Sequence, residues 1–135
     1  MKRFLTLLMC GMLTFIANAQ VKVVQKNKMP KPIVNFVNAN YNDREVLAYQ
    51  IDFTNYNFKH VEDYEVLYEN GTKLEFLKNG SLKSIDCGRL DYVKWYILPE
   101  EITEFIKYYF TQFVVIEYSI DYRFNKPIKK FKFGY

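Results

Sequence analysis

The chain has 135 residues, a formal net charge of +4, and hydrophobic side chains at half of its positions. This length suits a single domain that can bury a core of its own, without disulfides or metal ions to hold it together. The charge is too balanced to indicate a nucleic-acid-binding protein.

The first 19 residues have the pattern of a secretory leader. Lys2 and Arg3 form a positive start, an apolar run covers residues 4–16, and Ala17-Asn18-Ala19 offers small residues for cleavage. The apolar run is shorter than the roughly 20 residues of a membrane-spanning helix. Acylation at Cys10 is a weaker alternative, because a large Met precedes it. We therefore predict a periplasmic or secreted protein, cleaved after Ala19, which keeps a formal charge of +2 because the leader takes two basic residues and no acid.

The next elements are predicted from periodicity. Residues 20–28 are expected to be a polar linker, and residues 29–53 read as a short helix that runs into a strand. Residues 54–63 show neither period and are expected to form a loop. Three short strands follow, separated by Asn70-Gly71 and Asn79-Gly80. Both pairs are predicted to be two-residue hairpin turns rather than glycan acceptors, because their residues tolerate positive φ.

Residues 98–122 repeat the unit of residues 29–53. The two segments align without a gap, and seven of the 25 pairs are identical, Phe36 with Phe105 among them. The identities fall on the helix start, the apolar helix face and the strand, which favours duplication over chance. We predict one domain over residues 29–135, made of repeats 29–87 and 98–135 that share a core, with Phe36 and Phe105 both packed into it.

The strands predict one apolar face and one polar face. Alternation places the following residues toward the helices: Leu47, Tyr49, Ile51, Phe53, Tyr64, Val66, Tyr68, Leu74, Phe76, Ile116, Tyr118, Ile120, Tyr122, Phe131 and Phe133. The opposite face carries mixed charges and has no predicted helix left to cover it. Antiparallel sheets often leave one face in water, so simple solvation is the alternative to a binding surface.

The sequence offers little for catalysis or metal binding. His60 is the sole histidine and falls in the polar loop, without a second group at a spacing that suggests a proton relay. Cys87 has no group near it in sequence that is both basic and titratable and would lower its pKa, and we expect a half-buried, unreactive thiol at a strand end. We predict neither an enzyme nor a cofactor.

Several motifs are similar to those of the PepSY-like family of exported β-lactamase-inhibitor-like proteins. The matching residues are Tyr64, Glu65, Val66, Asn70, Gly71, Thr72, Leu74, Glu75, Phe76, Asn79, Gly80, Ile85, Asp86, Leu98, Pro99 and Ile102. The resemblance implies two tandem helix-plus-sheet repeats, with both helices on one face of a shared antiparallel sheet and recognition on the other. It supplies no catalytic residues. The long 54–63 loop and the lack of an Asn-Gly hairpin in the second repeat depart from the family pattern.

The sequence thus predicts an α+β domain that recognises or inhibits another cell-envelope protein through its open sheet face and adjoining loops. The candidate partner-binding residues are Glu65, Lys73, Glu75, Trp95, Tyr96, Glu117 and Arg123. The rival hypothesis is a protein that binds a cation or small ligand through the carboxylates of Asp52, Glu65, Glu117 and Asp121.

Overall fold

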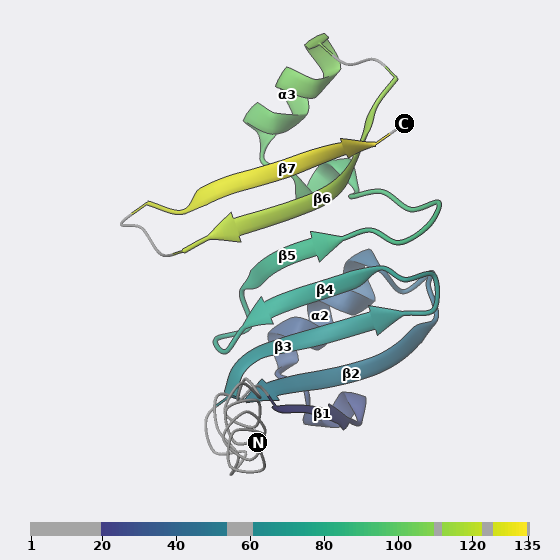
Figure 1. Cartoon of the computed structure of the whole chain (residues 1–135), viewed down its shortest axis with the longest axis vertical. Coiled ribbons are helices and arrows are strands. Elements are labelled where there is room, and N and C mark those ends of the chain that lie inside the picture. The colour runs from purple at the N-terminus through teal and green to yellow at the C-terminus, as the bar shows by residue number, and fades with distance from the viewer. Residues whose placement is uncertain (1–19, 54–60, 110–111, 123–125, 135) are drawn as a thin grey trace, which may run out of the picture.

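The computed structural model describes residues 20–53, 61–109, 112–122 and 126–134, and it shows an α+β fold, as predicted. Seven antiparallel strands form one open sheet in chain order (Figure 1). The strands are β1 (Gln20–Val24), β2 (Val46–Phe53), β3 (Val61–Tyr68), β4 (Lys73–Leu77), β5 (Leu82–Asp86), β6 (Val114–Asp121) and β7 (Ile128–Gly134). The helices are α2 (Lys31–Asn40) and α3 (Glu100–Tyr109), and each follows a short 3-10 helix, η1 (Lys26–Lys28) or η2 (Trp95–Ile97).

The two helices differ in how they meet the sheet. Helix α2 lies behind the middle strands, whereas α3 lies beyond β7, at the end of the sheet (Figure 1). Ile33 and Val37 of α2 are buried, but Ile106 is the one buried residue of α3. Within the described part of the chain, no helix is long and apolar enough to cross a membrane.

The stretch expected to be a linker is part of the fold. Gln20–Val24 pairs with β2 along its whole length, and Val24 packs against the core. The strand was missed because Val21 and Val23 point to solvent and the run is short. The expected 54–63 loop is shorter than predicted, since β3 begins at Val61. Its remaining residues, His60 among them, lie outside the described residues.

The two Asn-Gly hairpins form as predicted, but with three-residue turns. Gly71 and Gly80 have φ of +88° and +85°, while neither preceding Asn has a positive φ. In the first hairpin Tyr68 N–H donates to Thr72 O, and Gly71 N–H donates to Tyr68 O. This is a type I turn closed by a left-handed glycine, and the Asn70 side chain accepts a hydrogen bond from Thr72 N–H instead of adopting positive φ.

A single core lies between the sheet and the helices. Its fully buried side chains include Ile33, Tyr41, Val66, Tyr68, Leu74, Phe76, Ile85, Ile106 and Val115. The predicted inward set is wrong at Leu47, which is 65% exposed, at Ile116 and at Tyr122. Bulges interrupt the ladders between Val46 and Ala48 and between Val115 and Glu117, so Val46 and Val115 face the core. Tyr122 lies one residue past the end of β6.

The duplication extends further than the sequence suggested. A constant offset of 69 residues superposes η1 on η2 and α2 on α3, and it also places the two bulges at the same aligned position. One consequence predicted from the duplication is wrong. Phe36 packs edge-on against Phe76 with ring centroids 5.5 Å apart, whereas Phe105 is 46% exposed.

Candidate functional site

The face of the sheet opposite α2 carries two polar rows that cross the strands. Strand register aligns Glu65, Glu75, Ser84, Ser119 and Lys130 from β3 to β7. A second row joins Lys73, Asp86, Glu117 and Lys132 from β4 to β7. Because side chains alternate along each strand, the two rows lie side by side on the same open face. We call this surface the open face.

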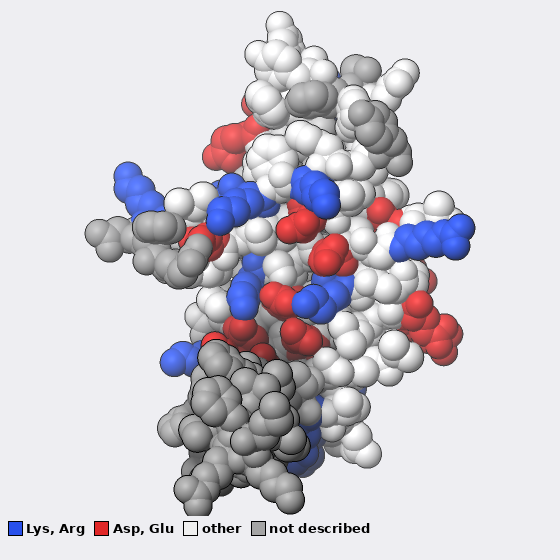
Figure 2. All heavy atoms as spheres, in the orientation of Figure 1, with Lys and Arg blue, Asp and Glu red and all other residues white. Residues whose placement is uncertain are grey.

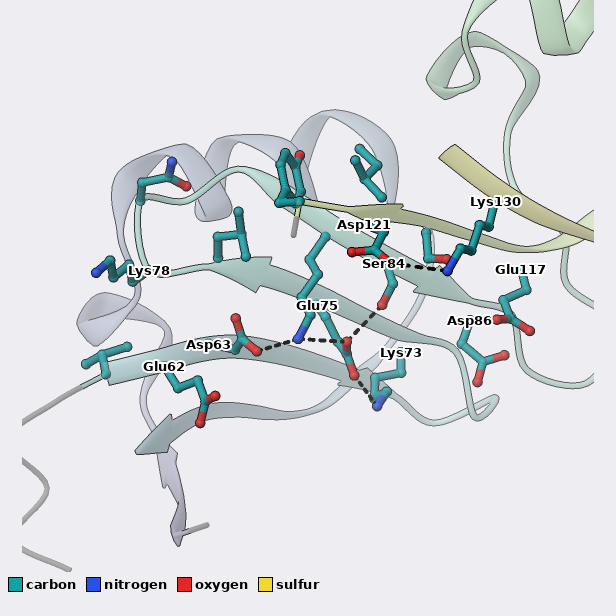
Figure 3. A pocket seen from close by; sticks show the side chains of 17 residues that line it. Glu62, Asp63, Lys73, Glu75, Lys78, Ser84, Asp86, Glu117, Asp121 and Lys130 are labelled. Carbon is teal, nitrogen blue, oxygen red and sulfur yellow. Dashed lines mark hydrogen bonds and ion pairs between the residues drawn. The ribbon is translucent and has the colours of Figure 1, made fainter. Parts of the chain in front are cut away.

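Ion pairs connect the charges of the open face into a network (Figure 3). Lys73 binds Glu75 directly and has Glu65 3.8 Å away. Lys83 Nζ lies 2.5 Å from Asp63 Oδ2 and 3.8 Å from Glu75 Oε2. Glu75 therefore stands at the centre of the network, between two lysines.

A hydroxyl and a further ion pair complete the network. Ser84 Oγ donates to Glu75 Oε2 at 3.0 Å. On the next two strands, Lys130 Nζ lies 3.3 Å from Asp121 Oδ2. Lysines and carboxylates are thus mixed across the face, and Figure 2 shows the two signs interleaved over its centre.

The network changes the titration of its members. Burial disfavours ionisation of Glu75, but the hydrogen bond and charge of Lys73, with Ser84 and Lys83, outweigh it and lower the Glu75 pKa. Burial raises the pKa of Glu65, and Glu75, Asp52 and Asp63 act in the same direction, against the attraction of Lys73. The charges of Glu75 and its neighbours raise the Lys73 pKa despite burial. The pKa shifts of Glu75 and Lys73 therefore favour their charged forms, whereas that of Glu65 favours its neutral form.

The centre of the open face is hollowed. The hollow lies across β3 to β7 and is open to solvent, with its floor formed by the polar rows (Figure 3). Lys73, Glu75, Lys83, Glu117 and Lys130 line it. A broad, open, charged depression suits contact with another macromolecule better than enclosure of a small apolar ligand.

The structure brings together part of the predicted partner-binding set. Glu65, Lys73, Glu75 and Glu117 share the open face. Arg123 lies outside the described residues.

Trp95 and Tyr96 do not adjoin the open face. Both belong to η2, and neither lines the hollow. Trp95 packs against the core on the helix side, and Tyr96 is 68% exposed. They were candidate partner-binding residues because aromatic side chains are common at the centre of interfaces, and residue type alone does not determine the side of the sheet.

Sequence reasoning missed three members of the network, Asp63, Lys83 and Ser84. Asp63 fell within the expected loop, and Lys83 lies beside a register shift between β4 and β5 that breaks simple alternation. If the sequence had predicted that β3 starts at Val61, alternation along the strand would have placed Asp63 on the open face. Nothing in the local pattern around Lys83 marks the shift.

The carboxylates of the rival cation-binding hypothesis do not form a ligand cluster. Among the described residues, no group of three or more His, Cys, Asp or Glu side chains could hold a metal ion. Asp121 is engaged by Lys130, and Glu65 faces Lys73. A hard cation such as calcium takes six to eight oxygen ligands, which this arrangement does not offer.

A second polar cluster ties the first repeat to the connection that follows it. Asp91 is a buried carboxylate that accepts hydrogen bonds from Arg44, Asn70, Thr72 and the Tyr92 N–H. These contacts hold the Asp91 pKa at about 2 in spite of burial. The cluster contains no nucleophile with a lowered pKa, and burial raises the pKa of nearby Cys87 to about 12.

Comparisons with known proteins agree with this fold. A family model described as "Putative beta-lactamase-inhibitor-like, PepSY-like" matches residues 15–63 and 62–126, and the two matched segments support the duplication. No curated protein matches the chain.

Solved structures resemble it as well. One is a "putative calcium-regulated periplasmic protein" from Bacteroides thetaiotaomicron, with 24% identity, a TM-score of 0.70, and coverage of 84% of this chain and 82% of that one. Another is a "putative periplasmic protein" from Bacteroides vulgatus, with 21% identity, a TM-score of 0.72, and coverage of 84% and 83%. At these identities the likeness shows a shared fold.

Proposed function

The chain belongs to the PepSY-like, β-lactamase-inhibitor-like family, and we propose that it is an exported, non-enzymatic module that binds another protein of the cell envelope through its open face. The observation that carries this proposal is the ion-pair network of β3 to β7, in which Glu75 is held between Lys73 and Lys83. Such a network presents a fixed charge pattern without a reactive group. Fixed complementary charges give a protein interface its specificity and speed its association.

Periplasmic location is supported by the similar solved structures, whose descriptions name periplasmic proteins. Cleavage after Ala19 is part of the proposal. Strand β1 begins at Gln20, so this cleavage removes no part of the described fold. Intact-mass analysis of the exported protein is expected to give a chain that starts at Gln20. A product that retains Met1, or one acylated at Cys10, would contradict this.

The experiment that tests the binding function is affinity capture from the envelope fraction of the source cells, with mass spectrometry of what is retained. The wild-type chain is expected to retain a partner that a charge-exchanged open face does not. Equal recovery by both forms would mean that the open face is only solvated. If calcium alone raised the melting temperature of the protein, that result would favour the rival cation-binding function.

A further inference from the structure

We propose that the outer edge of β7, together with the exposed aromatic side of α3, accepts an extended strand of a partner protein in which acidic and apolar residues alternate. This site adjoins the β7 end of the open face and shares Lys130 and Lys132 with it, but it does not depend on the function proposed for that face. The inference comes from comparing the two repeats, one of which contains such a strand.

Strand register makes β7 the counterpart of β3. Val46 pairs with Tyr68, and the aligned Val115 pairs with Phe133. Beyond the bulges, Tyr49 pairs with Val66, and the aligned Tyr118 pairs with Phe131. In the first repeat the far edge of β3 is covered by β4. In the described part of the chain, β7 has β6 as its one neighbour and lies at the edge of the sheet.

The side chains next to this edge are less buried than their counterparts. Val66 and Tyr68 are buried, at 0% and 1% exposure, whereas Phe131 and Phe133 are only half-buried. The difference in burial arises from β4, because Leu74 of that strand pairs with Val66. The second repeat keeps the apolar residues that a neighbouring strand would cover.

Helix α3 is also more exposed than α2 at the corresponding position. In the first repeat α2 rests Phe36 on Phe76 of β4, whereas Phe105, the counterpart of Phe36, is 46% exposed. Figure 1 shows α3 extending past β7, over the side where the next strand would run. A strand added to β7 would therefore pair with a backbone edge and place an apolar side chain beneath Phe105, as Phe76 lies beneath Phe36. Main-chain pairing plus side-chain pockets is the usual basis of strand addition.

The charges of β7 favour a partner strand with acidic residues. Lys130 and Lys132 stand on the open-face side of β7, where an added strand would place its own outward residues directly opposite them. Lysines on an edge strand resist pairing with a second basic edge. Copies of β7 would oppose lysine with lysine. A strand with acidic residues on its outward face is therefore the favoured partner.

The test uses the chain from Gln20 onward and three short synthetic peptides. One alternates glutamate with apolar residues around a central phenylalanine, the second has lysine in place of glutamate, and the third is a shuffled form of the first. The acidic alternating peptide is expected to bind best and to slow amide hydrogen exchange in β7. The double variant Lys130→Glu, Lys132→Glu is expected to lose about tenfold or more in affinity for it and to prefer the basic peptide.

Matched variants distinguish peptide binding at β7 from a general effect of the protein's net charge. Lys28→Glu with Lys31→Glu makes the same change in net charge at exposed positions of η1 and α2, and it is expected to keep the acidic preference. Phe105→Ala is expected to weaken binding several-fold, whereas Tyr108→Ala is not, because the α2 counterpart of Tyr108 is the exposed Ala39. Exchange of the central open-face pair on β4, Lys73→Glu with Glu75→Lys, should leave peptide binding unchanged. Equal binding of the three peptides, protection at β1 instead of β7, or an unchanged preference in the β7 variant would overturn the proposal.

Discussion

Arg44 and Asp91, which lie 47 residues apart in the chain, form a bidentate ion pair with donor–acceptor distances of 2.8 and 2.5 Å. Arg44 precedes β2 in the first repeat, and Asp91 lies in the connection from β5 to η2. Thr72 Oγ1 donates to the same carboxylate at 2.6 Å and accepts from Gly88 N–H at 3.0 Å. The Asn-Gly hairpin, the start of β2 and the connection between the repeats are therefore tied at one buried point.

The first prediction concerns the stability contributed by this pair. Asp91→Ala is expected to lower the free energy of unfolding by about 3–5 kcal/mol, because it leaves Arg44 and Thr72 without their buried partner. The control is Asp43→Ala, which removes the other carboxylate bound to Arg44 but is 59% exposed at its side chain. That change should cost less than about 1 kcal/mol. Urea denaturation of the two variants measures both, and equal losses would contradict the prediction.

The second prediction is the acid response of the same carboxylate. Burial is outweighed by the hydrogen bonds from Arg44 and Thr72, and the Asp91 pKa falls to about 2 in the folded protein, compared with about 3.9 in an unfolded chain. A lowered folded pKa adds stability above the unfolded value, and this contribution is lost as the pH falls toward 2. Asp91→Asn should therefore flatten the decline in stability between about pH 4 and 2. A variant as acid-sensitive as the wild type would show that other carboxylates control this response.

Much of the fold could be predicted from the sequence because local patterns determine it. The helix starts directly after Pro30 and Pro99, the left-handed glycines of both hairpins and the alternation at the end of β3 all appear in the structure. Three features could not be predicted because they depend on distant contacts. Leu47 and Ile116 leave the core because of bulges, and Asp91 is buried because Arg44 meets it from another part of the chain.

The candidate site was only partly predictable for the same reason. Alternation placed Glu65, Lys73, Glu75 and Glu117 on one face, as the structure has them. It could not show that Lys83 reaches Glu75, since that depends on the register between two strands.

The third prediction tests the unequal docking of the two helices. Phe36→Ala should cost about 3 kcal/mol, because the ring packs against Phe76 and the core. Phe105→Ala should cost about 1 kcal/mol or less, because its ring is 46% exposed. Thermal or chemical unfolding distinguishes the two values. A loss at Phe105 as large as that at Phe36 would mean that α3 is docked as firmly as α2.

The fourth prediction concerns Cys87, a half-buried free cysteine. Burial and the charge of Asp91 raise the Cys87 pKa to about 12, against the smaller effect of Arg44, so little thiolate forms at neutral pH. Because the thiolate is the reactive form, a thiol reagent should label the folded protein far more slowly than the same protein in denaturant. Equal labelling rates in the two conditions would rule out a protected thiol.

The fifth prediction exchanges charges at the centre of the open face. Lys73→Glu combined with Glu75→Lys preserves net charge and retains an ion pair between the two positions while inverting the pattern that a partner would meet. Both side chains are partly exposed, so the exchange should change the free energy of unfolding by no more than about 1 kcal/mol. Affinity for a captured partner should fall about tenfold or more, mainly through lost charge complementarity. The control exchange, Glu100→Lys with Lys107→Glu, lies on exposed positions of α3 and should leave that affinity unchanged. Titration of the isolated partner against the three proteins makes the comparison. Binding that survives the open-face exchange at full strength would remove the basis for the proposed function, even if the fold and the family assignment stand.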